Sequence, residues 1–201
     1  MKKFSRLNFL NKAIIGDSGE VLNGLFSSKY AKLDIKLPEY DFKRGKVLVG
    51  DINRWLDTED EKLTITELIN LLYENLLKDI ITNKEHHFIE NIAYTYMEKK
   101  RNYPIFKKKE VLWPDQNHPY PPSKPLNSND RIIVIPIKIL KESTLRGEVF
   151  LHDMYEAYSE FNVTLEEIIT IHYIDVMSEI KKGNNTIVRS ILKNLTQPDR
   201  V

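Results

Sequence analysis

Two stretches of this 201-residue chain resemble each other, and this internal similarity limits the possible folds more than any other feature. Segments 33–52 and 135–154 are identical at six of twenty aligned positions, where ordinary composition gives roughly one by chance. The second segment then drops two residues, and 63–77 aligns with 163–177, again with identities such as Tyr73 and Tyr173. The spacing of about 100 residues predicts an internal duplication.

Each copy is predicted to begin with a β-hairpin. In the first copy, apolar residues alternate with polar ones over 31–37, which is typical of a half-buried strand. Residues 47–49 lie between Gly45 and Gly50 and are expected to form the second strand. In the second copy, the nearly continuous apolar run 132–139 predicts a strand covered on both faces, with Pro136 at an edge or a bulge.

Segment 148–161 is ambiguous. Taken alone, it has the pattern of an amphipathic helix. Because the first copy has two glycines at the corresponding place, we expect 149–151 to be a strand as well, followed by a short helix that Asp153 caps, as Asp51 does in the first copy. The Arg-Gly pairs at 44–45 and 146–147 are then expected to be turns in which glycine takes a positive φ, with an anion site formed by the two arginines as the alternative.

The clearest helix starts are two capping boxes, Thr64 with Glu67 and Thr164 with Glu167. The helices that they open are expected to end near Thr82 and Lys181. A further helix should follow in each copy, over 85–100 and 186–195. The predicted fold class is therefore α+β, with two diverged copies of a β-hairpin plus three-helix unit related by a pseudo-two-fold axis.

The predicted organisation has four parts. Residues 1–29 form a lead-in with a short hairpin, in which 13–15 is a strand before the turn at 16–19. Repeat unit one covers 30–100, and a connector rich in proline, aromatic and basic residues covers 101–129. Repeat unit two covers 130–201. Whether the two copies pack together is left open by the sequence, as is the oligomeric state.

Composition excludes several classes of function. The net charge of +1 gives no global attraction to nucleic acid or membrane, and the absence of cysteine excludes disulfides and thiolate metal sites. The chain has no eighteen-residue apolar run. Its start has two lysines like a signal peptide, but polar residues break the apolar region and no cleavage site follows. We therefore expect a cytoplasmic protein of bacterial or phage type, without membrane association. No glycine-rich phosphate loop or catalytic set is evident, so we expect no cofactor and lean away from an enzyme.

Charge pattern favours a protein-binding function. Eight acidic residues and no lysine or arginine lie between Glu148 and Ile180, so helices here would repel DNA phosphates. The leading hypothesis is a non-catalytic module, such as an adaptor, inhibitor or regulatory subunit, that binds a basic protein surface. The acidic residues expected to make that contact are Glu156, Glu160, Glu166 and Glu167. A solvated acidic face is the simpler alternative.

Two further functions remain open. Basic residues interleaved with aromatic ones are typical of nucleic-acid binding, and here they are Lys99, Lys100, Arg101, Lys107, Lys108, Lys109 and Trp113. They are also consistent with an ordinary helix end and loop. A metal-dependent hydrolase would use His86, His87, His152 and His172 with nearby carboxylates. Against that, His172 lies in an apolar helix stripe where the first copy has Leu72, which favours a structural core histidine.

Overall fold

The computed structural model describes residues 2–15, 28–56, 62–82, 88–106 and 131–196, and within them the fold is α+β. Two strands, β1 (Tyr30–Pro38) and β2 (Ile132–Leu140), pair antiparallel. Each strand runs directly into a helix: α3 (Glu39–Leu56) follows β1, and α6 (Lys141–Ala157) follows β2. The remaining elements are α1 (Phe9–Ile15), α4 (Ile65–Thr82), α5 (Phe88–Asn102), the 3-10 turn η1 (Pro104–Phe106), α7 (Leu165–Lys181) and α8 (Asn185–Thr196).

The two strands form a ribbon from segments about 100 residues apart. Pairing is continuous from Tyr30 opposite Leu140 to Pro38 opposite Ile132, so Pro136 introduces no bulge. In a two-stranded sheet both strands are edges, which is where proline is tolerated. The inward residues are buried, including Leu33, Ile35 and Ile137.

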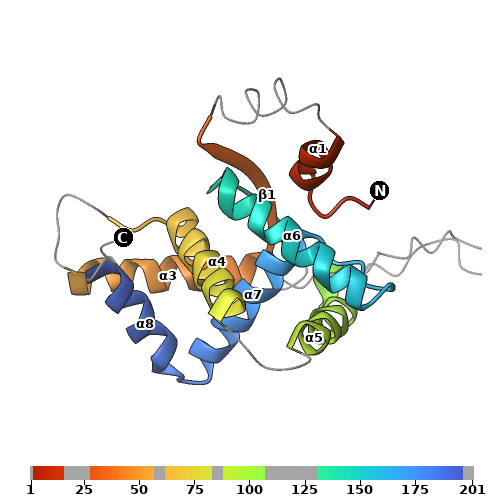
Figure 1. The fold of residues 1–201 in the computed structure, drawn as a ribbon. Coiled ribbons are helices and arrows are strands. Elements are labelled where there is room, and N and C mark those ends of the chain that lie inside the picture. The colour runs from red at the N-terminus through yellow and green to blue at the C-terminus, as the bar shows by residue number, and fades with distance from the viewer. Residues whose placement is uncertain (1, 16–27, 57–61, 83–87, 107–130, 197–201) are drawn as a thin grey trace, which may run out of the picture.

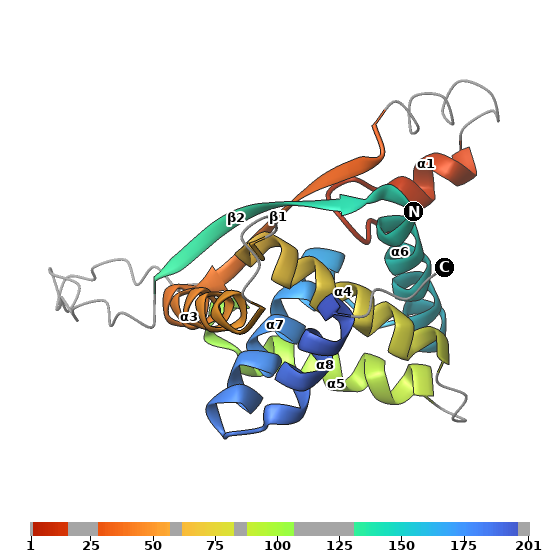
Figure 2. The ribbon, with the colours of Figure 1, turned by 90° about the vertical axis from the view of Figure 1, so that its left-hand side faces the viewer.

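The expectation that 132–139 is covered on both faces is wrong. The outward side chains of Ile132 and Val134 are 46% and 55% exposed, because the helices pack on the inner face of the ribbon. Figure 2 shows the ribbon along one side of the molecule with α3, α4 and α7 beneath it.

Each strand is supported by a helix from the other half of the chain. α7 packs beneath β1, and α4 packs beneath β2. The Thr170 hydroxyl donates to the Lys36 carbonyl at 3.0 Å, and the Asn70 amide donates to the Lys138 carbonyl at 2.7 Å. Residues of both halves belong to one hydrophobic core. The two halves therefore pack on each other rather than standing apart (Figure 1).

The hairpin predicted within each copy is absent, because 47–49 lies inside α3 and 149–151 lies inside α6. The amphipathic pattern of 148–161 correctly indicated a helix, and the strand predicted at 149–151 by alignment with the first copy is wrong. Asp51 and Asp153 accordingly lie within α3 and α6 and do not cap short helices. Residues 13–15, predicted to be a strand, belong to helix α1.

Gly45 and Gly147 are helical, and neither takes the positive φ expected of a turn. Each allows a tyrosine from the other half to approach the helix backbone. A Cβ atom on Gly45 would overlap the Tyr173 hydroxyl, and one on Gly147 would overlap the Tyr73 hydroxyl. Glycine costs about 1 kcal/mol in a helix interior, and these contacts offset that cost.

The starts and ends predicted for the two capping-box helices, α4 and α7, are confirmed. The Thr164 hydroxyl accepts the Glu167 backbone N–H, and the Glu167 carboxylate accepts the Thr164 backbone N–H, which completes the capping box of α7. Thr64 and Glu67 make the same pair of bonds before α4. The chain leaves α7 through Gly183, whose φ is 86°.

The predicted turn at 16–19 and most of the connector 101–129 lie outside the described residues. Among the helices that the structure describes, none is long and apolar enough to cross a membrane.

Candidate functional site

The outer face of the β1–β2 ribbon is the most distinctive exposed surface in the described part of the chain. Its alternating exposed positions carry three lysines, Lys32, Lys36 and Lys138, together with Asp34. Apolar side chains occupy the remaining outward positions of β2, at Ile132, Val134 and Pro136. Nothing in the described ranges buries these residues.

The register brings like charges together on this face. Lys32 lies directly opposite Lys138, whereas Lys36 lies opposite Val134. Opposed like charges on neighbouring strands are destabilising, so the lysine pair is unfavourable in the free protein. Asp34, at the centre of the ribbon, pairs with Arg6 at 2.8 Å, and both side chains are substantially exposed.

Cationic residues also flank both ends of the ribbon. At one end the Lys141 backbone N–H donates to the Lys29 carbonyl at 3.1 Å, so these two lysines are adjacent. At the other end the Glu39 N–H donates to the Arg131 carbonyl at 2.8 Å, and the Arg131 guanidinium lies 3.9 Å from the Glu39 carboxylate. The ribbon and its ends therefore form a locally basic surface on a chain whose net charge is only +1.

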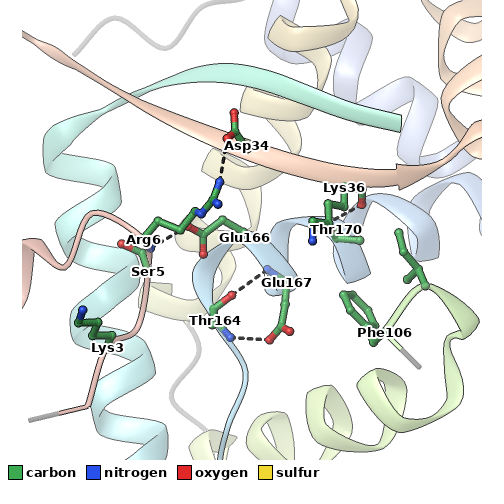
Figure 3. A pocket seen from close by; sticks show the side chains of 11 residues that line it. Lys3, Ser5, Arg6, Asp34, Lys36, Phe106, Thr164, Glu166, Glu167 and Thr170 are labelled. Atoms are coloured by element: carbon green, nitrogen blue, oxygen red, sulfur yellow. Dashed lines mark hydrogen bonds and ion pairs between the residues drawn. The ribbon is translucent and has the colours of Figure 1, made fainter. Parts of the chain in front are cut away.

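A cleft of about 640 Å³ lies beside β1, between the N-terminal segment, the start of α7 and η1 (Figure 3). Its polar walls carry both signs of charge. The Glu166 carboxylate accepts the Arg6 backbone N–H at 2.9 Å, and Glu167 is held in the α7 capping box. Both carboxylates are therefore already bound within the chain.

The N-terminal segment is anchored by a buried carboxylate, an arrangement that the predicted lead-in did not suggest. Glu148 of α6 is fully buried, where it accepts the Ser5 hydroxyl and the Leu10 backbone N–H, the latter at 2.5 Å. The Phe4 carbonyl accepts the Leu165 backbone N–H at 2.8 Å. These bonds hold residues 4–10 against α6 and the start of α7.

The four acidic residues predicted to bind a partner fall into two groups. Glu166 and Glu167 are half-buried at the start of α7 and have partners in the chain, as described above. Glu156 is exposed near the end of α6, with His152 3.8 Å away, and Glu160 is exposed just beyond that helix.

Acidic residues of α7 form ion pairs with the basic residues at the end of α5. The Lys99 ammonium donates to Asp175 at 2.7 Å, and the Lys100 ammonium donates to Glu167 at 2.8 Å. The Tyr103 hydroxyl also donates to Asp175, and burial, followed by that bond, raises the pKa of Tyr103. Of the residues predicted to bind nucleic acid, Arg101 is exposed, whereas Lys107, Lys108, Lys109 and Trp113 lie outside the described residues.

The histidines predicted for a metal site have different surroundings. His152 packs edge-on against Phe4, with ring centroids 5.8 Å apart. His172 is largely enclosed, and burial lowers its pKa, while Asp175 and Asp79 partly oppose that shift. His86 and His87 lie outside the described residues. Within the part of the chain that the structure describes, no three histidine, aspartate or glutamate side chains gather as a metal site would require.

Comparisons with known proteins give no relative: no family model, curated protein or solved structure matches this chain.

Proposed function

We propose that this protein binds double-stranded DNA by placing the outer face of the β1–β2 ribbon in the major groove. The observation that carries the proposal is the exposed ribbon with Lys32, Lys36 and Lys138 on its outward face. The major groove of B-form DNA is about 12 Å wide and admits a two-stranded β-ribbon. Paired strands lie about 4.8 Å apart, which leaves room for side chains on either side. Several known DNA-binding proteins use strands in this way.

Electrostatics supports an anionic ligand at this face. The negative potential of the groove would offset the repulsion between the opposed Lys32 and Lys138 in the free protein. Lys29, Lys141 and Arg131, at the two ends of the ribbon, are placed to contact the backbone strands that border the groove. A net charge of +1 means that the attraction is local to the ribbon.

The chemistry of the face favours duplex DNA over other nucleic acids. Single-stranded DNA and RNA are held largely by aromatic stacking, and Tyr30 alone is aromatic among the outward ribbon residues. The major groove of A-form RNA is too deep and narrow for side chains to read. The nucleic-acid interface predicted at Lys99–Trp113 is less favoured, because Lys99 and Lys100 already bind acidic residues of α7.

We also infer that the two halves of the chain are diverged copies, as the sequence similarity predicts. Equivalent contacts recur with the halves exchanged: Tyr73 meets Gly147, and Tyr173 meets Gly45. The Tyr73 hydroxyl donates to the Ser143 carbonyl and the Tyr173 hydroxyl to the Asp41 carbonyl, at positions that correspond in the sequence alignment. The unit that repeats is a strand followed by three helices, and its two copies together supply the ribbon.

The test is a titration of a labelled mixed-sequence DNA duplex by fluorescence anisotropy at several salt concentrations. The triple variant K32A/K36A/K138A should bind at least tenfold more weakly, and its log–log salt slope should fall by about one for each lysine that neutralises a phosphate. A matched triple variant, K78A/K182A/K193A, removes the same charge from the helical layer and should bind like the parent. Equal loss in both variants, or no binding at low salt, would contradict the proposal.

A protein-binding module remains the second candidate, carried by the exposed Glu156 and Glu160 around the end of α6. Charge reversal by E156K/E160K should abolish capture of any basic partner from a lysate treated with nuclease. The matched variant E74K/E98K reverses exposed or half-exposed acidic residues on α4 and α5 and should retain that partner. Capture that survives in both variants would remove this candidate.

A further inference from the structure

The two ends of the ribbon differ in chemistry, and this difference bears on which DNA it reads. The pairing register divides the outward face at the central pair, Asp34 opposite Pro136. On one side of that pair Lys32 lies opposite Lys138 and Tyr30 opposite Leu140, with Lys29 and Lys141 beyond them. We call this the lysine end.

The other side of the central pair has one lysine within the ribbon and more apolar surface, with Arg131 beyond it. Lys36 lies opposite Val134, and Pro38 lies opposite Ile132. Val134 and Ile132 are about half exposed, although strands usually turn such β-branched residues inward. We call this the valine end. The alignment of the two copies places Val134 where the first copy has Lys32, so the copies differ at a position that faces outward in both strands.

In the major groove, guanine and thymine present chemical groups that differ in the same way as the two ends of the ribbon. Guanine presents two acceptors, O6 and N7, which lysine and arginine contact as donors. Thymine presents a methyl group that apolar side chains contact. Nine residues at about 3.3 Å each make the ribbon about 30 Å long, more than twice the groove width, so it has to lie along the groove. Its two ends then face different base pairs.

We propose, on the basis of the DNA-binding function above, that the preferred site is a non-palindromic duplex, with guanine in the half under the lysine end and thymine in the half under the valine end. Two identical strands related by a two-fold axis would instead favour a palindrome. The outward exchange of Lys32 in one strand for Val134 in the other is sufficient to make the two half-sites unlike.

The experiment selects bound duplexes from a pool with a randomised central region and sequences them. The parent protein should enrich an asymmetric motif with guanines in one half and thymines in the other. Replacing the thymine half by a second guanine half should weaken binding roughly tenfold.

The variant V134K places a lysine opposite Lys36, as Lys138 lies opposite Lys32, and should shift the motif towards a palindrome with guanine in both halves. The matched variant V47K adds the same charge at a 63% exposed valine on α3 and should leave the parent motif unchanged.

The outcomes separate this inference from the function on which it rests. A palindromic parent motif, salt-dependent binding without sequence enrichment, or an unchanged motif in V134K would each overturn the asymmetric site while leaving DNA binding intact. Failure of the parent protein to retain any duplex at low salt would overturn the DNA-binding function itself.

Discussion

Replacing Gly147 by alanine should destabilise the protein, although it removes a glycine from the middle of a helix. In an unobstructed helix the change gains about 1 kcal/mol. In α6 the added methyl group would overlap the Tyr73 hydroxyl and approach the Leu165 Cδ1 atom to 2.7 Å. Tyr73 is buried, and its hydroxyl donates to the Ser143 carbonyl at 2.7 Å, so displacing the ring would break that hydrogen bond.

The expected magnitude follows from two opposing effects. Overpacking of this severity costs about 3 kcal/mol, which leaves a net loss of about 2 kcal/mol after the gain in helix propensity. Tyr73→Phe alone should cost about 1 kcal/mol through its lost hydrogen bond. Because phenylalanine removes the overlapping oxygen, the double variant should lose about 1 kcal/mol or less. The coupling free energy between the two sites is then about 2 kcal/mol.

Urea unfolding followed by far-ultraviolet circular dichroism measures all four states of this cycle. The control is Gly50→Ala in α3, where no heavy atom lies within 4 Å of the added methyl group. That variant should gain about 0.5–1 kcal/mol. If Gly147→Ala were as stable as Gly50→Ala, or if Tyr73→Phe failed to rescue it, the glycine–tyrosine contact would not be what keeps glycine in this helix.

Three further predictions concern local features. Thr164→Ala removes the hydroxyl of the α7 capping box and should lower the free energy of unfolding by about 1 kcal/mol. The control Thr95→Ala removes an exposed hydroxyl within α5 and should lower it by less than about half of that, so equal losses in urea unfolding would contradict the cap. Glu148→Ala removes the carboxylate that accepts hydrogen bonds from Ser5 and Leu10, and it should speed tryptic cleavage after Arg6 and Lys12 several-fold. The control Glu142→Ala, on the exposed side of α6, should leave the cleavage rate unchanged. Similar cleavage of the two variants would show that Glu148 does not anchor this segment. Burial lowers the pKa of His172 below its ordinary 6.5, so the unfolded chain takes up more protons and the free energy of unfolding falls as the pH drops below about 6.5. His172→Leu should flatten the dependence of stability on pH between about pH 7 and about pH 5. An unchanged dependence would exclude this histidine as its cause.

The candidate site was only partly readable from the sequence. The alternation over 31–37 indicates that Lys32 and Lys36 lie on one exposed face of a strand, and this much is local information. The partner strand is not local information, since β2 begins more than ninety residues after β1 ends. Without knowledge of that pairing, the run 132–139 predicts a fully covered strand, and the sequence does not show that Lys32 and Lys138 lie opposite each other.

The acidic run shows the same limit. Eight acidic residues with no lysine or arginine among them in the sequence predicted a surface for a basic partner. In the structure, however, Asp175 and Glu167 form ion pairs with Lys99 and Lys100 of α5. Charge pattern along a chain does not reveal which charges meet across the fold. The exposed Glu156 and Glu160 were distinguishable from the others only once those contacts were known.

By itself the sequence determined the starts of α4 and α7, because a capping box is complete within four residues, and it determined β1, because strand alternation is a property of neighbouring residues. The tertiary structure decided that Gly45 and Gly147 lie in helices, since the tyrosines that need their space come from the opposite half of the chain. It also decided which strands pair and which face of the ribbon stays open. Those outcomes depend on contacts between segments about a hundred residues apart, and only the folded chain brings such segments together.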